Sequence, residues 1–345
     1  MHDRVLNEKV LLQVENLKMH FPVRSGFLRQ NKSVVKAVDG VSFEIHAGET
    51  FGLVGESGCG KTTVGKCILG ILNPTGGKIC FDGREISVSK QKSVNLNHRD
   101  IQLIFQDPYG SLDPRQSAYA MLKEALLIGT HGLNQDAVTE KINSLLQTVG
   151  LSPEIGMRYP HELSGGQRQR LGIARALACD PKLIVCDEPV SALDVSIQAQ
   201  IINLFRELQD RLGLTYLFVA HDLAVVRHIA NRIGVMYLGE LVEVIEAADL
   251  YTEAIHPYTL ALLSAVPTTD YHAERERTRI ILQGEVPSPT NKPAGCPFHP
   301  RCIYATDKCR SVCPELRDVG EGHFVSCHNM ESIQLLKKNK STQTA

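Results

Sequence analysis

The segment Gly55-Glu-Ser-Gly-Cys-Gly-Lys-Thr62 decides the fold of this chain. It fits the pattern G-x-x-x-x-G-K-[ST] at every fixed position, and it stands between the apolar run 51–54 (FGLV) and a helical pattern over residues 62–72. Glycines let backbone N–H groups turn inward around a phosphate, and the N-terminus of the following helix adds positive potential there. A glycine turn that carries a lysine by accident would need all of these features to coincide. The segment therefore predicts a phosphate-binding loop in which Lys61 reaches the terminal phosphates and the Thr62 hydroxyl holds Mg²⁺.

An acidic pair follows a second apolar strand pattern. Residues 183–186 (LIVC) are typical of a strand buried on both faces, and they lead into Asp187 and Glu188. Because charge is costly inside a sheet, both carboxylates are expected at the open end of the strand. There Asp187 would contact Mg²⁺ through water, and Glu188 would act as general base on the attacking water. Alone, the pair also fits a solvated acidic turn; beside the phosphate loop it predicts nucleotide hydrolysis.

Composition excludes several classes of protein. With 345 residues, 43% hydrophobic and 22% charged, the chain is not disordered, collagen-like or a small disulfide scaffold. Its 37 Lys and Arg against 38 Asp and Glu give a net charge of −1, which argues against nucleic acid as the main partner. No uncharged apolar stretch approaches the roughly 18 residues of a membrane helix, and residues 1–17 lack the apolar core of a signal peptide. We expect a soluble protein of the cytoplasm.

Strand and helix patterns alternate along the chain, which indicates a parallel α/β sheet. Strand patterns cover residues 11–17, 34–45, 51–54, 101–105, 183–186 and 215–220. Apolar residues at 201, 204, 205, 208 and 212 have the spacing of an amphipathic helix. Residues 115–160 carry helical patterns and no strand signal, so they predict an inserted helical subdomain. Beyond about residue 250, prolines interrupt any long element and five cysteines crowd together: Cys296, Cys302, Cys309, Cys313 and Cys327.

The segment Leu163-Ser164-Gly165-Gly166-Gln167, followed by the helical RQRLGIARALA, resembles the signature of the ATP-binding cassette (ABC) family. Ser164 and the glycine backbone form a second anion site before a helix, usable only by a phosphate from outside its own loop. In this family two cassettes pack head to tail, so that the signature of one closes on the ATP of the other. The resemblance implies an α/β P-loop NTPase core with an N-terminal antiparallel β subdomain, an inserted helical subdomain and a C-terminal cysteine-rich extension.

The same resemblance implies domain boundaries and site residues. The ATPase domain would span residues 10–262 with its helical subdomain at about 107–170, the extension 263–330, and a polar tail 331–345. Gln106 matches the Q-loop glutamine that touches Mg²⁺ and senses the permease, Ser191 and Asp194 match the D-loop, and His221 matches the switch histidine on the γ-phosphate. Phe21 would stack on adenine, with His20 and Phe27 as alternatives. The implied ATP-binding set is Phe21, Gly55, Glu56, Ser57, Gly58, Cys59, Gly60, Lys61, Thr62 and Thr63; Mg²⁺ would be held through Thr62, Gln106 and Asp187; and the catalytic set is Glu188, His221 and Gln106.

Five further stretches resemble the oligopeptide and dipeptide importers, and within them the second ATP-binding subunit: HFPVRSGF, KAVDGVSFEI, RYPHELSGGQRQR, PVSALDVSIQAQ and HPYTLALLSAVP. This resemblance covers roughly residues 10–330. It implies a heterodimer with a homologous ATPase, two transmembrane permease subunits, indirectly an extracytoplasmic substrate-binding protein, and a peripheral place at the cytoplasmic face of the cell membrane. Nickel and opine importers share this sequence style and stay open as alternatives. An ABC ATPase of DNA repair or translation is a more distant alternative, opposed by the short separation between loop and signature.

The cysteine cluster has the spacing C-x5-C-x6-C-x3-C-P, with thirteen residues before the last cysteine. It is neither a zinc ribbon nor the bacterial ferredoxin run. The resemblance to peptide-importer ATPases implies a four-iron, four-sulfur cluster on Cys296, Cys302, Cys309 and Cys327, which leaves Cys313 as an extra. Zinc on four of these thiolates, with His299, His323 and His328 as substitute ligands, and unligated cysteines are the alternatives. The group would clip a proline-rich tail that has little core of its own, or it would sense redox state.

Overall fold

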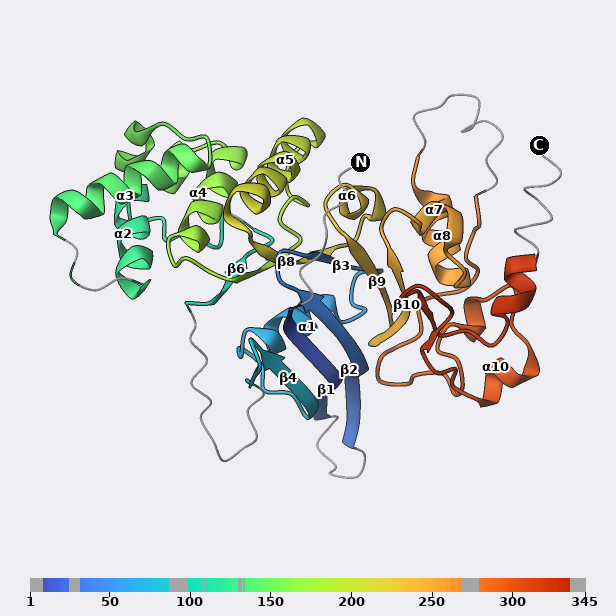
Figure 1. The fold of residues 1–345 in the computed structure, drawn as a ribbon. Helices are drawn as coiled ribbons and strands as arrows, with labels where there is room; N and C mark the ends of the chain where they lie inside the picture. Colours follow the sequence, from blue (N-terminus) through green and yellow to red (C-terminus); the bar gives the residue numbers. More distant parts are fainter. Residues whose placement is uncertain are drawn as a thin grey trace.

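The computed structural model describes residues 9–24, 32–86, 99–107, 109–129, 132, 134–267 and 279–335. Within these residues one eight-stranded sheet crosses the molecule in the order β11-β12-β10-β9-β3-β8-β7-β6 (Figure 1). Its parallel part consists of β6 (Ile101–Ile104), β7 (Leu183–Asp187), β8 (Thr215–Ala220), β3 (Thr50–Val54) and β9 (Arg232–Tyr237). Because parallel strands end at the same edge, the segments after β3, β6, β7 and β8 meet there. These segments carry the phosphate loop, Gln106, Asp187 with Glu188, and His221.

Helices and a second sheet bury the two faces of the parallel strands. On one face, α4 (Gly165–Leu177), α5 (Val195–Leu212) and α6 (Leu223–Arg227) pack over alternate strand residues such as Ile184 and Cys186. On the other, α1 (Lys61–Ile68) and an antiparallel sheet pack over Leu183 and Val185. Every residue of β3 and β8 is buried. The uninterrupted apolar runs in the sequence thus reflect strands covered on both sides.

The antiparallel sheet has the order β2-β1-β4-β5. It is built from β1 (Val10–Arg24), β2 (Lys32–His46), β4 (Gly76–Phe81) and β5 (Arg84–Glu85). Leu12, Val14 and Leu17 of β1 are buried toward α1, and Phe43 of β2 stacks on Phe51 of β3 with ring centroids 4.9 Å apart. This sheet is the N-terminal antiparallel subdomain that the resemblance implied.

Residues 109–164 contain helices and, among the residues described there, no strand. α2 (Ala118–Gly129), α3 (Gln135–Thr148), η1 (Pro153–Met157) and η2 (Pro160–Glu162) pack with α4 into a helical subdomain at one end of the molecule (Figure 1). The Asn134 side chain caps α3 by accepting a 2.8 Å hydrogen bond from the Ala137 N–H. Among the helices of the described residues, none combines the length and apolar character that a bilayer span requires.

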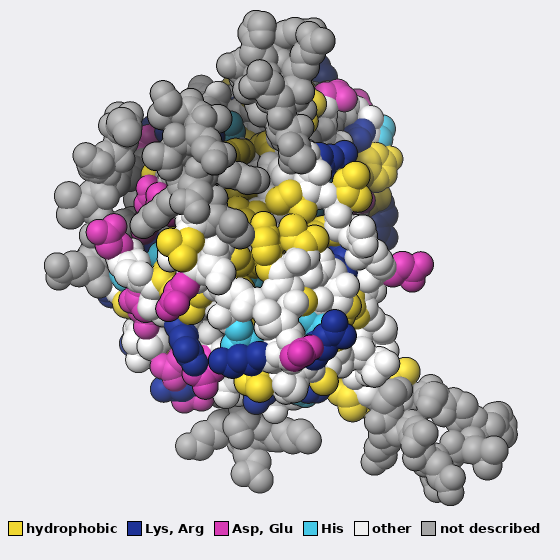
Figure 2. Space-filling view, turned by 90° about the vertical axis from the view of Figure 1, so that its right-hand side faces the viewer, with side chains coloured by type: hydrophobic (Ala, Val, Ile, Leu, Met, Phe, Trp, Pro, Cys, Tyr) yellow, Lys and Arg dark blue, Asp and Glu magenta, His cyan; other side chains and the backbone are white. Residues whose placement is uncertain are grey.

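The C-terminal part of the chain, from β10 onward, continues the main sheet. β10 (Glu240–Glu246) runs antiparallel to β9, and β12 (Phe324–Val325) and β11 (Arg317–Asp318) add to it. α7 (Leu250–Glu253), α8 (Pro257–Ala265), η3 (His299–Arg301) and α10 (Asp307–Ser311) surround this edge. Ile333, at the start of the expected polar tail, is buried beside Ile255 and Val325. On the face formed by the extension, Lys and Arg alternate with Asp and Glu rather than forming one basic surface (Figure 2).

Candidate nucleotide-binding and hydrolysis site

The phosphate loop joins β3 to α1 and depends on glycine at both of its ends. Gly60 has a φ of 109°, and a β-carbon there would lie 2.1 Å from the carbonyl oxygen of Ala37. At Gly55, φ is 152° and a β-carbon would lie 2.1 Å from the carbonyl oxygen of Met236. Both collisions are with backbone, which cannot move aside as a side chain could. The two outer glycines of the motif are therefore required by the packing of the loop.

Lys61 opens α1 and is held inside the loop. Its side chain is 4% exposed, and Nζ donates hydrogen bonds to the carbonyl oxygens of Gly55 at 2.8 Å and Glu56 at 3.1 Å. Burial raises the pKa of the neighbouring Cys59 thiol, in spite of the Lys61 charge. Ser57 and Gly58 are the exposed residues of the loop, and Thr62 and Thr63, in the first turn of α1, are half-buried. The ammonium group thus lies among the loop residues that the sequence assigned to ATP.

Thr62 and Asp187 bring a hydroxyl and a carboxylate together. The Thr62 Oγ1 donates a 2.8 Å hydrogen bond to Oδ1 of Asp187 at the end of β7. Burial raises the pKa of Asp187, the bond from Thr62 opposes that shift, and the charge of Glu188 adds to it. With the Gln106 amide, this is a set of hard oxygen donors of the kind that Mg²⁺ prefers. The residues present therefore suit the expected ion.

Gln106 and His221, which follow the strands on either side of β7, both contact the Glu188 carboxylate. Gln106 Nε2 donates to Glu188 Oε2 at 2.9 Å, and His221 Nδ1 lies 3.4 Å from the same oxygen. Glu188 has a φ of 48°, a left-handed conformation that costs a side chain energy and persists where the surroundings fix it. Here its N–H donates to the Val219 carbonyl at 2.9 Å and its own carbonyl accepts from the Ser191 hydroxyl at 3.0 Å. The carboxylate that the sequence assigned as base is thus held in one place.

The signature residues form the start of α4. Ser164 is the N-cap, accepting from the Gln167 N–H at 3.3 Å while its own N–H donates to Gln167 Oε1 at 3.0 Å. Leu163 is buried beneath them, whereas Ser164 and Gly165 are exposed. Gly166 approaches α5 closely, since a β-carbon there would lie 2.9 Å from Ile197 Cγ2. α4 packs with α2, α3 and α5, whereas α1 packs with β2, β7 and β8, so the signature belongs to a different part of the molecule from the phosphate loop.

Two implied residues have less defined surroundings. Asp194 is the exposed N-cap of α5, and its side chain makes no capping hydrogen bond. Phe21 lies on β1 opposite Val35 of β2 and is half-buried against the core beneath that sheet. The neighbouring His20 Nε2 is 3.0 Å from Asp39 Oδ1. Phe27 lies outside the described residues, so the residue that stacks on adenine stays a prediction.

The C-terminal part of the chain, after β10, supplies two loop contacts that sequence reasoning missed. The Tyr258 hydroxyl of α8 accepts a 2.8 Å hydrogen bond from the Glu56 N–H. The Arg301 guanidinium donates to both Glu56 carboxylate oxygens, at 2.8 and 3.1 Å. The contacting residues are 202 and 245 positions apart in the sequence, so no local pattern predicts these contacts. The one signal in the sequence is the stretch HPYTLALLSAVP, which contains Tyr258 and resembles the peptide importers but does not indicate a contact with the loop.

Four of the five late cysteines converge. Burial, together with the charges of neighbouring thiols, raises the pKa of Cys296 to about 12 and of Cys302 to about 11. Cys309 and Cys327 act on both, and Cys302 acts on Cys296 as well. The pKa of Cys327 is raised in the same way, by burial and by the charge of Cys309. Within the part of the chain that the structure describes, no three His, Cys, Asp or Glu side chains are arranged to hold a single metal ion. The iron–sulfur assignment therefore stays a prediction.

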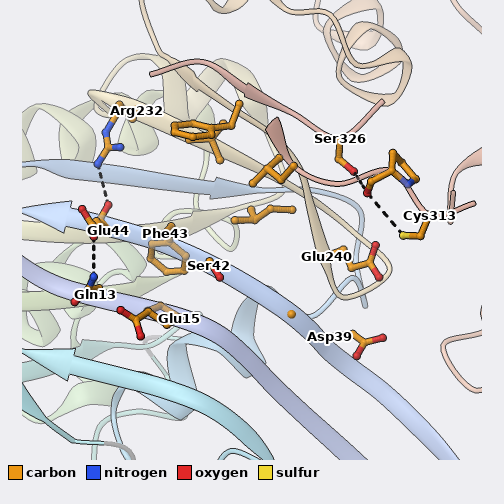
Figure 3. A pocket seen from close by; sticks show the side chains of 17 residues that line it. Gln13, Glu15, Asp39, Ser42, Phe43, Glu44, Arg232, Glu240, Cys313 and Ser326 are labelled. Atoms are coloured by element: carbon orange, nitrogen blue, oxygen red, sulfur yellow. Dashed lines mark hydrogen bonds between the residues drawn. The ribbon is translucent and has the colours of Figure 1, made fainter. Parts of the chain in front are cut away.

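Cys313 belongs to a different place. It lines a cavity of about 560 Å³ between β1, β2 and the extension, together with Asp39, Glu240 and the apolar Phe43. Figure 3 shows Cys313 beside Ser326, across the cavity from Ser42 and Glu44, and its thiol donates to the Pro314 carbonyl at 3.8 Å. The cavity lining includes none of the other four late cysteines, and the assignment of Cys313 as an extra stays a prediction.

A groove of about 620 Å³ separates the core from the helical subdomain. Its lining includes Ile71 and Phe105 from the core and Ile128 from α2, and all three side chains are exposed. The Arg175 guanidinium carbon lies 5.8 Å from the centre of the Phe105 ring. Phe105 directly precedes Gln106, so one wall of the groove is continuous with the residues predicted to be catalytic.

Known proteins resemble the chain over nearly its whole length. The family model for the ABC transporter matches residues 38–191, and the model for the oligopeptide/dipeptide transporter C-terminal region matches residues 242–309. The oligopeptide transport ATP-binding protein AppF of Bacillus subtilis (strain 168) is 51% identical over 324 residues, which are 93% of this chain and 98% of AppF.

Solved cassette structures share the fold. The ATP-binding cassette MJ0796, solved as a dimer in a post-hydrolysis state with ADP and Pi, has a TM-score of 0.61 at 27% identity and covers 69% of this chain and 99% of its own. cbiO1 of Clostridium perfringens, part of the ABC transporter complex cbiONQ, has a TM-score of 0.60 at 27% identity over 71% of this chain and 92% of its own. The P-loop, the acidic strand end, the signature helix and these relatives lead to one conclusion: the chain is an ATPase and belongs to the ATP-binding subunits of the oligopeptide/dipeptide ABC transporter family.

Proposed function

We propose that this chain powers the uptake of dipeptides and oligopeptides by hydrolysing ATP at the cytoplasmic face of the cell membrane. The observation that carries the proposal is the meeting of Gln106, Glu188 and His221 beside the phosphate loop, in a chain 51% identical to a protein named for oligopeptide transport. Peptide, rather than nickel or an opine, follows from the names of the relatives. A role in DNA repair or translation finds no support among them.

In the proposed mechanism, the loop N–H groups and Lys61 hold the ATP phosphates. Thr62, Asp187 and Gln106 would hold Mg²⁺, which neutralises charge on the phosphates when bound. Glu188 takes a proton from the attacking water, and His221 contacts the γ-phosphate from the end of β8. Phosphoryl transfer of this kind depends mainly on positioning and on charge neutralisation, so the fixed conformation of Glu188 serves the reaction directly.

The signature is proposed to act on a nucleotide held by a partner. Support comes from the exposed N-terminus of α4, where Ser164 and Gly165 offer an anion site away from the chain's own phosphate loop. MJ0796, of the same fold, was solved as a dimer. We infer a head-to-tail heterodimer with a second, homologous ATPase, in which ATP closes two composite sites and hydrolysis reopens them.

The groove beside α2 is proposed to receive a cytoplasmic segment of the permease pair. Exposed apolar side chains on both of its walls favour an apolar partner surface. Phe105 lines the groove, and the next residue, Gln106, bonds to Glu188. Movement of a docked segment against Phe105 would therefore shift Gln106 and, through it, the Glu188 carboxylate. This coupling, with the binding protein acting on the outer side of the permease, completes the proposed importer.

The cysteine group is proposed to hold a four-iron, four-sulfur cluster on Cys296, Cys302, Cys309 and Cys327. The donor set suits it, because soft thiolates are the ligands that iron–sulfur clusters take and the charges of Cys302, Cys309 and Cys327 all act on the Cys296 thiol. When bound, the cluster would supply a cross-link between η3, α10 and the segment after β12. Zinc on the same thiolates is the alternative.

The proposal is tested with the transporter purified from native membranes by a tag on this chain and reconstituted in proteoliposomes. We expect ATP-dependent accumulation of radiolabelled dipeptides and oligopeptides, lost in Glu188→Gln. Accumulation of radioactive nickel or of an opine, without peptide, would contradict the peptide assignment. Recovery of the chain without any membrane subunit would contradict the transport role.

The docking groove has its own test. Ile128→Glu places a charge on an exposed apolar wall of the groove, and we expect it to release the chain from the membrane fraction. Leu212→Glu, at an exposed position at the end of α5, is the matched control and should stay membrane-associated. Equal retention of both variants would place the docking surface elsewhere.

A further inference from the structure

Glu56, the second residue of the phosphate loop, has every one of its polar groups engaged. Its carbonyl oxygen accepts from Lys61, its N–H donates to Tyr258, and its carboxylate receives two hydrogen bonds from Arg301. Two of these three partners lie more than 200 positions further along the chain: Tyr258 near the end of the ATPase domain, and Arg301 in the extension. The shape of the phosphate loop is therefore fixed partly from outside the ATPase core.

The Arg301–Glu56 pair differs from an ordinary surface ion pair. The Arg301 side chain is only 8% exposed and that of Glu56 is 28% exposed, and the two groups meet in a bidentate arrangement. Such pairs hold one geometry and are screened by salt less than exposed pairs. The contact is thus able to fix both the position and the charge of Glu56.

A packed aromatic group fixes Arg301 in turn. Phe298, three residues earlier, is buried and lies with its ring centroid 5.2 Å from that of Tyr237 and 5.4 Å from that of Tyr258. The Arg301 guanidinium carbon is 5.9 Å from the Tyr237 ring centroid, and its backbone N–H donates to the Phe298 carbonyl at 3.0 Å. One aromatic cluster therefore supports both Tyr258 and Arg301, the two residues that contact the loop from the C-terminal part of the chain.

The contact between Arg301 and Glu56 bears on ATP binding because Glu56 is negatively charged. A carboxylate one residue into a loop that binds phosphate repels the anion and competes with it for the Lys61 ammonium, whose Nζ already lies 3.1 Å from the Glu56 carbonyl oxygen. Arg301 offsets that charge and holds both carboxylate oxygens in hydrogen bonds at 2.8 and 3.1 Å. Without Arg301, the loop would present an uncompensated negative charge beside its own anion site.

We propose that Arg301 is a positioning residue of the nucleotide site, through which the C-terminal extension sets the affinity of the phosphate loop for ATP. Arg301 acts on Glu56 and touches no reacting atom, so its loss changes ATP binding and leaves the chemical step nearly intact. The inference rests on ATP binding alone and is independent of the substrate that the transporter carries. It gives the extension a role beyond that of a clip on the chain's end.

The test is a double-variant cycle on the full-length chain, with Mg-ATP binding and hydrolysis both measured. We expect Arg301→Gln to weaken ATP binding and raise KM for ATP by about tenfold, with kcat changed less than about threefold. In Glu56→Gln/Arg301→Gln the carboxylate is gone, so ATP affinity should recover to within about threefold of that of Glu56→Gln. Arg301→Lys keeps the charge and should fall between wild type and Arg301→Gln.

Salt and a matched control separate charge from packing. The Arg301→Gln defect should shrink as ionic strength rises, since salt screens the uncompensated Glu56. Arg317→Gln, at an exposed arginine of the same extension, should bind ATP like the wild type. Wild-type ATP affinity in Arg301→Gln would overturn the inference. So would a double variant as weak as Arg301→Gln alone, because the arginine would then act through the fold rather than through Glu56.

Discussion

Gln106 and Glu188, 82 residues apart in the sequence, are joined by a 2.9 Å hydrogen bond from the amide Nε2 to the carboxylate Oε2. The two follow neighbouring strands, β6 and β7, so the pairing is a product of the parallel sheet. Gln106 also follows Phe105, which lines the groove beside the helical subdomain. The bond therefore connects the wall of that groove to the proposed general base.

Gln106→Ala is expected to slow ATP hydrolysis by about ten- to a hundredfold, because Glu188 loses the partner that orients it. ATP binding should stay within about threefold of wild type, since the phosphate loop is unchanged. Gln116→Ala, whose amide lies on the helical side of the same groove, is the control and should leave hydrolysis by the isolated chain unchanged. Turnover in Gln106→Ala equal to that of the control would show that the hydrogen bond has no part in catalysis.

Two substitutions at Ser164 separate its structural role from its proposed contact with the partner's ATP. Ser164→Ala removes the cap of α4 and should lower the free energy of unfolding by about 1 kcal/mol, whereas Ser164→Gly should cost only a few tenths. In the assembled transporter both variants should reduce ATPase activity to a similar extent, because both lack the hydroxyl. Chemical denaturation and ATPase assays provide the two measurements. If ATPase activity instead falls in Ser164→Ala and stays near wild type in Ser164→Gly, as the free energy of unfolding does, Ser164 acts only as a helix cap.

His256 makes stability depend on pH. It is 1% exposed at the start of α8, accepts a 3.2 Å hydrogen bond on Nδ1 from the Tyr258 N–H, and burial lowers its pKa from 6.5 to about 4, against the opposing effect of Glu243. Between these values the unfolded chain binds a proton that the folded chain does not. The stability that neutral His256 contributes is therefore fully present above pH 6.5 and is lost as pH falls toward 4. The total loss in the free energy of unfolding is about 3 kcal/mol.

Denaturation of wild type and His256→Asn at a series of pH values checks this contribution. Asparagine retains a side-chain acceptor for the cap but does not titrate, so the variant should show a shallower loss of stability between pH 6.5 and 4. The same slope in both proteins would mean that His256 is protonated in the folded chain.

Metal analysis distinguishes the late cysteines from one another. Anaerobically purified protein is expected to contain about four iron and four sulfide per chain, with a broad visible absorption band. Cys302→Ser should lower both contents and the melting temperature. Cys313→Ser should change neither, because Cys313 lies in a separate cavity beside Asp39 and Glu240. Zinc without sulfide in the wild type, or unchanged iron in Cys302→Ser, would reject the cluster.

The sequence predicted the parallel core well, because its strands are buried on both faces. Residues 51–54, 183–186 and 215–220 were predicted as strands and lie in β3, β7 and β8. An uninterrupted apolar run bounded by glycine or charge leaves few other structures for such a segment. Those same strands place Lys61, Asp187, Glu188 and His221 at one edge, so most of the candidate hydrolytic site followed from strand order and motif together.

The later strands were not predicted. β9 and β10 form a hairpin over residues 232–246, and β11 and β12 are two residues each, too short to carry a periodic pattern. They pair only because β10 provides an open edge of the sheet. Glu56 illustrates the same limit at the site: its motif position was known, but its contacts with Tyr258 and Arg301 depend on how the extension folds back over the loop.

The most direct test of the account is hydrolysis and nucleotide binding by Glu188→Gln, measured together in the assembled transporter. Glu207→Gln, at an exposed glutamate on α5, serves as the control. We expect Glu188→Gln to bind Mg-ATP as tightly as wild type and to hold the two ATPase subunits closed, while turnover falls by at least about a hundredfold. Substantial residual hydrolysis in Glu188→Gln, with the control at the wild-type rate, would contradict Glu188 as the general base and the mechanism built on it.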